Sequence, residues 1–381
     1  MALSYCWGWQ GQVVTTVSNI QSHMRGIAVS SLPKTIQDAV HVARGLEIPN
    51  LWIDSLCIIQ DDPTDKAVEI AQMPLVYSQA TLTLKASRSS DVHEGFLGER
   101  QAAVADAVKG RQFQLPYRCL SGTTEMVDIF LHFDEYMTEP LDTRAWALQE
   151  RFLSSRLPDF GTYQTRWLCQ LKGDGIPTDG YRGVLVDDEQ TLDHLLWRKL
   201  VGIYGSRKLT FQSDRLPAIS GLAIRFASLL DDQYYAGLWK SRLAYDLLWH
   251  TTFDDFEGTC IHVVELNGPS WSWCSVPGPI IFLDNIEEKG PAVSLDISNI
   301  QTDLTDGGGL YGAVLSGSLI VTGQVQEALC YSIGGERHPW HIATLERSID
   351  GTSLHETIPS YVKWILEPRW KMASLKSQCF C

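Results

Sequence analysis

The sequence has no excess of basic residues and no long apolar run, and each absence excludes a class of protein. The chain of 381 residues carries 31 Lys and Arg against 45 Asp and Glu, a formal net charge of −14. This charge disfavours binding to nucleic acid or to an anionic membrane surface, since both need a basic face. Because no run of about 18 apolar residues occurs, we expect no transmembrane helix and no membrane partner.

The usual signatures of disulfide, metal and nucleotide-binding sites are also missing. The nine cysteines form no Cys-x-x-Cys pair, and most lie in apolar runs, among them Cys6, Cys57, Cys169 and Cys274. We therefore predict reduced, packed thiols in a cytoplasmic protein. His338 and His341 flank a proline and have no third ligand nearby, so we predict no metal and no cofactor. The glycines within 307–312 lead into a strand pattern rather than a helix and are rejected as a dinucleotide fingerprint.

The first 170 residues contain an alternation of strand and helix patterns. Apolar runs and helical periodicity predict strands at 2–5, 50–54 and 80–86, alternating with helices at 32–48 and 63–73. Pro74 should end or kink the second helix because proline lacks the donor N–H. Strand, helix, strand, helix, strand predicts an α/β domain with a mostly parallel sheet and helices on both faces.

Three further patterns complete this α/β domain, which we place at residues 1–170. A helix is predicted at 143–154, between strand patterns at 127–133 and 163–169. The Gly- and Asp-rich stretch that follows, 170–187, suggests a domain boundary.

The rest of the chain changes in character at about residue 250. Residues 171–250 form a helical segment with helix patterns at 188–207, 214–230 and 236–249. Residues 251–381 carry short strand patterns, including SWSWCSV at 270–276, separated by turn residues. This region is therefore predicted to be β-rich, as an antiparallel sheet or a partial barrel.

Residues 142–160, DTRAWALQERFLSSRLPDF, combine a carboxylate, an indole and several guanidinium groups. In a helix Trp146 and Glu150 share one face. One interpretation is a helix pinned by ion pairs to a neighbouring arginine, with the indole in the core. The other is a carboxylate beside an aromatic wall, suited to stabilising a developing cation on a bound sugar. The segment alone is compatible with both, because Arg144, Arg151 and Arg156 all lie nearby.

Two strand ends offer further candidate residues. Tyr5, Trp7 and Gly8 follow the first predicted strand, and open parallel sheets bind ligands beyond the carboxyl ends of their strands. Gly8 would let the backbone approach a ligand, or it serves a turn that needs a positive φ. Asp54 ends the second strand at the same edge, where it contributes to a site or caps a turn with Ser55.

Several of these segments together resemble the fungal heterokaryon-incompatibility (HET) domain proteins. The resemblance is carried by LSYCWG (3–8), LPKTIQDAV (32–40), LWIDSLCIIQDD (51–62), the Met73–Tyr77–Ala80 spacing and PLDTRAWALQERFLSSR (140–156). It continues into the C-terminal half, for example in YGSRKLTFQSDRLPAISGLA. One departure is Leu168, which stands where the family has a glutamate in a Trp-Glu-Cys sequence.

HET domains in turn look like TIR domains, whose Trp-Cys-x-x-Glu glutamate serves NAD cleavage. The resemblance implies a TIR-like (flavodoxin-like) fold and an effector of non-self recognition and regulated cell death. It implies NAD or a related nucleotide as substrate, with Glu150 as the key carboxylate. The strand ends and the 143–154 helix add Asp54 as a second catalytic residue, and Tyr5, Trp7, Gly8, Arg144 and Trp146 as binding residues. Two alternatives stay open. One is a secondary-metabolite biosynthetic enzyme (a cyclase, dehydratase or isomerase) on the same fold, and the other is a non-catalytic module that forms a homo-oligomer.

Overall fold

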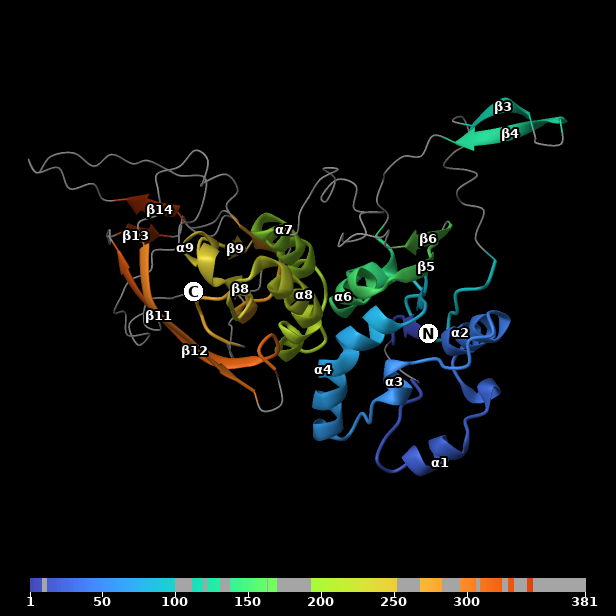
Figure 1. The fold of residues 1–381 in the computed structure, drawn as a ribbon, viewed down its shortest axis with the longest axis horizontal. Helices are drawn as coiled ribbons and strands as arrows, with labels where there is room; N and C mark the ends of the chain where they lie inside the picture. Colours follow the sequence, from blue (N-terminus) through green and yellow to red (C-terminus); the bar gives the residue numbers. More distant parts are fainter. Residues whose placement is uncertain are drawn as a thin grey trace, which may run out of the picture. The chain divides into compact units, whose positions relative to one another are not determined.

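The computed structural model divides into two compact units, Met1–Pro177 and Thr178–Cys381 (Figure 1). Within the residues that the structure describes, no helix is long and apolar enough to cross a membrane. The structure describes residues 1–8, 12–99, 112–118, 122–130, 138–162, 164–169, 193–251, 268–282, 295–305, 309–323, 328–331 and 341–344.

A four-stranded sheet organises the first unit. Its order is β1 (Ala2–Ser4), β2 (Thr83–Lys85), β5 (Arg156–Phe160) and β6 (Thr165–Cys169). The first three strands are parallel, and β6 runs antiparallel to β5. On the other side of β1, Trp52 forms an isolated parallel bridge with Ala2. The predicted α/β class is therefore confirmed, with a mixed sheet.

Two sequence-based expectations about this sheet are corrected. The strand predicted at 50–54 is reduced to the Trp52 bridge, because helix α3 (Asp54–Cys57) begins directly after it. The sequence predicts no strand at β5, and Pro158 inside it argues against one. The pairing of β5 with β2 falls at Asp159, while Pro158 lies opposite Trp167 in the pairing with β6.

Helices cover the sheet, and their ends follow the sequence closely with one exception. Helix α2 (Lys34–Gly45) starts after Pro33, and α4 (Pro63–Gln79) starts after Asp62, whose carboxylate accepts the Thr64 and Asp65 amides at 2.9 and 3.2 Å. Pro74 was expected to end or kink α4 after Met73, and it does not end the helix, which continues to Gln79. The remaining helical segments are α1 (Ile20–Arg25), η1 (Val29–Ser31), η2 (Pro140–Thr143) and α6 (Trp146–Leu153).

Packing explains why the proline does not end α4. Proline removes one N–H donor from the helix, but Met73, Pro74 and Tyr77 are all buried. Tyr77 also donates its hydroxyl to the carbonyl of Leu3 at 3.2 Å and packs edge-on against Trp52. These contacts hold the last turn of α4 against the sheet.

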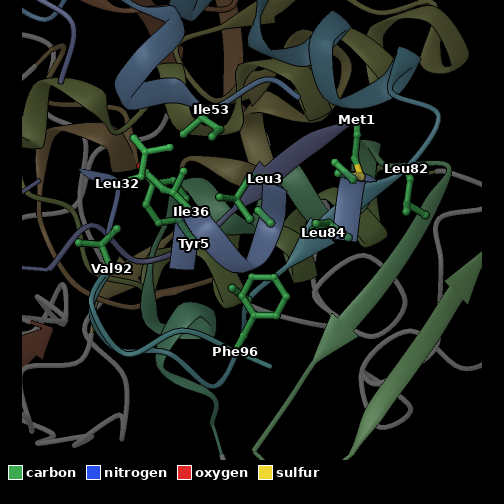
Figure 2. Packing of buried hydrophobic residues seen from close by; sticks show 13 residues of the cluster. Met1, Leu3, Tyr5, Leu32, Ile36, Ile53, Leu82, Leu84, Val92 and Phe96 are labelled. Atoms are coloured by element: carbon green, nitrogen blue, oxygen red, sulfur yellow. The ribbon is translucent and has the colours of Figure 1, made fainter. Parts of the chain in front are cut away.

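The two faces of the sheet differ in chemistry. On one face Leu3 and Leu84 pack with Ile36 of α2 in an apolar core that also contains Val92 and Phe96 (Figure 2). Helices α4 and α6 lie on the other face, next to each other (Figure 1). That second face carries the polar groups described below.

A separate hairpin and the second unit contain further corrections. The strand predicted at 127–133 is part of β4 (Thr124–Phe130), which pairs with β3 (Gln112–Arg118) and not with the four-stranded sheet; residues 131–133 lie outside the described residues. The helix predicted at 236–249 is wrong. That stretch contains a short strand, a 3-10 turn and a four-residue helix: β8 (Leu238–Trp239), η5 (Lys240–Arg242) and α9 (Leu243–Asp246).

The second unit combines helices with two-stranded antiparallel sheets. Its longer helices, α7 (His194–Gly205) and α8 (Ser220–Leu230), lie where the sequence predicts them. The stretch 270–276 is not a strand but contains the 3-10 turn η6 (Trp273–Ser275). The other elements are η3 (Gln212–Asp214), η4 (Pro217–Ile219) and the strands β7 (Tyr234–Tyr235), β9 (His250–Thr251), β10 (Ile280–Ile281), β11 (Leu295–Leu304), β12 (Val314–Gly323), β13 (Ala328–Tyr331) and β14 (His341–Thr344), paired as β7–β8, β9–β10, β11–β12 and β13–β14.

Aromatic side chains form the core of this second unit. Trp197 packs edge-on against Phe226, Tyr234 and Trp239. The carbonyl oxygen of Gly237 accepts the indole N–H of both Trp197 and Trp273 at 3.0 Å. Position 237 has a φ of +97°, and an added Cβ would lie 2.6 Å from the Trp273 ring, so only glycine fits there.

Candidate functional site

The end of β1 and the start of α3 are joined by side-chain hydrogen bonds. Trp7 donates its indole N–H to Asp54 at 2.8 Å, and the Tyr5 hydroxyl donates to Ser55 Oγ at 3.0 Å. Gln12 donates in turn to the Tyr5 hydroxyl at 2.6 Å. Tyr5, Trp7 and Asp54 therefore meet at one edge of the sheet.

Arg144 and Glu150 reach the same strand end. Nη1 of Arg144 donates to the carbonyl of Tyr5 at 2.9 Å, and the guanidinium also bonds the Cys6 thiol. The Glu150 carboxylate, on α6, accepts a hydrogen bond from the hydroxyl of Ser4, the last residue of β1. Ser4, and not an arginine, is thus the hydrogen-bond partner of Glu150, and only 6% of Glu150 is exposed.

Burial sets the charge behaviour of this carboxyl group. Removal from water raises the pKa of Glu150 from 4.5 to about 7. The Ser4 hydrogen bond and the charges of Arg144 and Lys85 oppose that rise, whereas the charge of Asp54 adds to it. Glu150 can therefore gain or lose a proton near neutral pH.

Asp54 is the second carboxyl group of the site. Burial raises its pKa, while the hydrogen bond from Trp7 and the charge of Arg144 lower it. Its other oxygen accepts the backbone N–H of Ser55, the next residue in the chain, at 2.7 Å. Asp54 thus contacts both Ser55 and Trp7, and its role in a site stays a prediction.

Gly8 and Trp146 lie at the margins of the group. Gly8 is exposed with a φ of +81°, and an added Cβ would lie 1.7 Å from an oxygen of Asp91. The backbone turn therefore requires glycine at this position. Trp146 is half-buried at the first position of α6, one helical turn before Glu150.

Among the described cysteines, Cys6 lies at this edge and is a poor nucleophile. Burial raises the pKa of Cys6 to about 11, so its thiol stays protonated at neutral pH. Cys274 is also buried and free, in agreement with the expected packed thiols. The expectation fails for Cys57 and Cys169, which are exposed because they end the short helix α3 and the sheet-edge strand β6.

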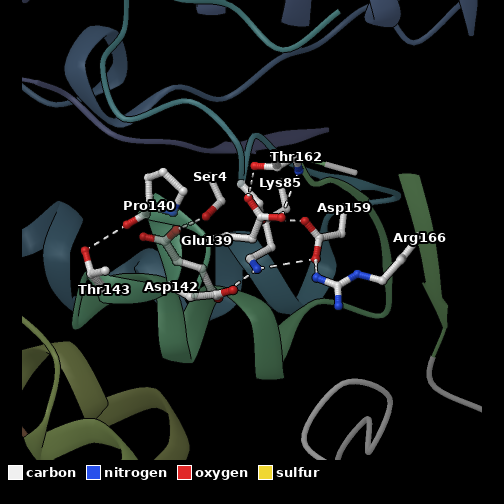
Figure 3. Close-up of polar contacts among 11 residues, drawn as sticks. Ser4, Lys85, Glu139, Pro140, Asp142, Thr143, Asp159, Thr162 and Arg166 are labelled. Atoms are coloured by element: carbon white, nitrogen blue, oxygen red, sulfur yellow. Dashed lines mark hydrogen bonds and ion pairs between the residues drawn. The ribbon is translucent and has the colours of Figure 1, made fainter. Parts of the chain in front are cut away.

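The sequence-based reasoning missed a buried lysine beside this site. Lys85, the last residue of β2, is fully buried, and its ammonium group contacts Asp142 at 2.8 Å and Asp159 at 3.4 Å (Figure 3). Asp159 also accepts from Arg166 at 2.7 Å and from Ser87. The available signal was a lysine inside the strand pattern TLTLKAS, where a buried charge needs partners.

A serine, a histidine and an aspartate also lie together in the second unit. Ser241 Oγ and Asp232 Oδ2 contact the same ring nitrogen of His194, Nε2, at 3.1 and 3.0 Å. A catalytic triad needs the two partners on opposite ring nitrogens. The Ser241 amide and hydroxyl both donate to Asp232, so the group orders a loop instead.

No cluster of three potential metal-ligating side chains occurs within the described part of the chain. His338 of the histidine pair and Gly307 of the glycine motif lie outside that part.

Comparison with known proteins identifies the N-terminal part of the chain. Residues 1–150 match the family model described as Heterokaryon incompatibility protein (HET). Neither the curated proteins nor the solved structures gave a match. The matched segment includes β1, the Trp52 bridge, β2 and α6 as far as Glu150.

Proposed function

We propose that the HET domain at residues 1–150 contributes Glu150 to a nucleotide glycosidase, which cleaves the N-glycosidic bond of NAD or a related nucleotide. The HET domain itself indicates a role related to heterokaryon incompatibility. In this proposal the cleavage is the output of an effector of non-self recognition and regulated cell death.

The observation that carries the proposal is a buried carboxyl group with a pKa of about 7 at the end of β1. From β1 the chain passes to the Trp52 bridge on one side and then to β2 on the other. Such a switch in strand order is where open α/β sheets bind ligands, beyond the carboxyl ends of the strands. The same order is found in flavodoxin-like folds, which supports the TIR-like interpretation.

The proposed chemistry needs one carboxylate beside the ribose. The bond between C1′ and the nicotinamide nitrogen breaks, and the bonding electrons leave with the neutral nicotinamide. Positive charge develops on the sugar, where ionised Glu150 stabilises it more than in the ground state. Water then bonds to C1′ and releases a proton, which gives ADP-ribose.

The surrounding side chains suit this substrate by their charge and by their aromatic rings. Asp54 adds negative charge near the developing cation, and Arg144 offers a cation for the phosphates. Trp7 and Trp146 are half-buried aromatic rings at the margin of the site, suited to packing against a base.

The test is release of nicotinamide from NAD by the purified full chain. Glu150→Gln keeps the shape of the side chain and should lower the rate by about 10³-fold. Glu47→Gln makes the same change of charge at an exposed residue after α2 and serves as the matched control. If the wild type releases no nicotinamide, the proposed activity is wrong. If Glu150→Gln releases nicotinamide at the wild-type rate, Glu150 has no part in the activity.

A further inference from the structure

Four residues form one continuous row across the sheet of the first unit. Ser4 of β1 pairs in register with Lys85 of β2, Lys85 pairs with Asp159 of β5, and Asp159 pairs with Arg166 of β6. Side chains at paired positions of neighbouring strands point to the same face. The row therefore crosses all four strands on the face covered by α6.

The row is charged and runs from the interior to the surface. Lys85 and Asp159 are fully buried, whereas the side chain of Arg166 is 33% exposed. Asp142, in η2, adds a second carboxylate on Lys85, so the ammonium group lies between two acids (Figure 3). The positive charges of Lys85 and Arg166 are therefore balanced by the negative charges of Asp142 and Asp159, and buried charges need such partners.

The buried end of the row lies at the proposed catalytic carboxyl group. Ser4 donates to Glu150, and Lys85 is the in-register neighbour of Ser4. The positive charge of Lys85 lowers the pKa of Glu150 against the effect of burial. A fully buried lysine is costly, and its position in register with Ser4, which bonds Glu150, indicates a role beyond packing.

We propose that Lys85 is a positioning residue of the Glu150 site. Asp142 and Asp159 hold its ammonium group on the face of the sheet that also carries Ser4 and Glu150, from where its charge acts on the Glu150 carboxylate. This role rests on the proposed function, because it concerns the ionised form of Glu150 that the glycosidase needs.

Other charged and titratable groups also act on or respond to Glu150, and the test must separate Lys85 from them. Arg144 lowers the pKa of Glu150, and Asp54 raises it. The negative charge of Glu150 in turn raises the pKa of two protonated groups, Tyr77 of α4 and Cys6. Variants of Lys85 and its acids leave these four groups in place.

The experiment follows the Glu150 carboxyl group directly. In the full chain labelled with ¹³C at glutamate carboxyl carbons, the resonance that Glu150→Gln abolishes is titrated by NMR. The wild-type midpoint is expected near 7. Lys85→Met should raise it by about one pH unit, since a nearby opposite charge favours the ionised form. Lys85→Arg keeps the charge and should stay close to the wild type.

Asp142→Asn supplies a variant that keeps the buried lysine and its fold. Because one of the two acids on Lys85 is neutralised, the Glu150 midpoint should fall below that of the wild type. Glu47→Gln, which changes an exposed charge, should leave it unmoved. An unchanged midpoint in Asp142→Asn, or in a folded Lys85→Met, overturns the role of Lys85.

The same variants separate this inference from the proposed activity. If the wild type releases nicotinamide, the pH–rate midpoints should move in the same directions as the NMR midpoints. If no nicotinamide is released but the NMR midpoints move as expected, the proposed glycosidase activity is wrong and the proposed action of Lys85 on Glu150 is supported. If nicotinamide is released but the midpoints do not change, the glycosidase activity is supported and the proposed action of Lys85 is wrong.

Discussion

The two faces of the first sheet are built from the same strands but differ in chemistry: one packs apolar side chains and the other holds buried charges. Leu3 and Leu84 point to a face that is apolar throughout and packs on α2. Their neighbours in the chain, Ser4 and Lys85, point to the other face and enter the charged row. The first face supplies stability through burial. The second holds buried charges at a desolvation cost, which is typical of functional sites.

The largest expected difference between the faces comes from breaking the charged row. Asp159→Ala removes the carboxylate that Lys85, Arg166 and Ser87 all contact, and breaking this buried network should cost about 4 kcal/mol. Leu84→Ala, on the apolar face, should cost about 3 kcal/mol through lost packing. Hydrogen exchange of the β2 peptides in the full chain measures both.

A double variant sharpens this contrast. Lys85→Met combined with Asp159→Leu removes the buried charges of the central strands together and should recover part of the loss seen in Asp159→Ala. If the double variant is less stable than Asp159→Ala, packing rather than charge dominates the second face.

The third-largest expected effect is the pH dependence of stability, which the second face has through Glu150. The folded pKa of Glu150, about 7, lies above the unfolded value near 4.5, so the folded protein binds more protons between these values. Its stability therefore falls as pH rises through this window, by on the order of 3 kcal/mol in total. Glu150→Gln removes this dependence. Urea denaturation of both proteins at pH 4 and pH 8 measures the difference.

The smallest expected effect is that of the hydroxyl group that joins the row to Glu150. Ser4→Ala should cost about 1 kcal/mol and raise the pKa of Glu150, because the hydrogen bond favours the ionised form. Ser154→Ala is the matched control, since its hydroxyl bonds Thr83 and the backbone carbonyl of Glu150 instead of the carboxylate. Equal shifts of the Glu150 titration in both variants would contradict the assigned role of Ser4.

The sequence predicts those parts of the site that depend on local patterns. Apolar runs located β1 and β2, helical spacing located α6, and Asp54 was expected at the edge where Trp7 binds it. Each of these predictions needs information from only a few neighbouring residues. The HET resemblance over 1–150 was likewise carried by contiguous segments.

The row of charges was beyond such reasoning because it depends on register between distant strands. Residues 4, 85, 159 and 166 become neighbours only once the three strand pairings are fixed. One of those strands, β5, contains Pro158, and proline has a low propensity for strands. The extension of α4 past Pro74 was missed for a related reason, since tertiary contacts of Tyr77 outweigh the local penalty.

The location of β5 and β6 has a practical consequence for dividing this gene product into pieces. A fragment cut where the family match stops, at residue 150, would lack both strands. It would leave β2 as a bare sheet edge and Lys85 with one acid instead of two. Expression of the N-terminal portion should therefore extend to Pro177, where the first compact unit ends.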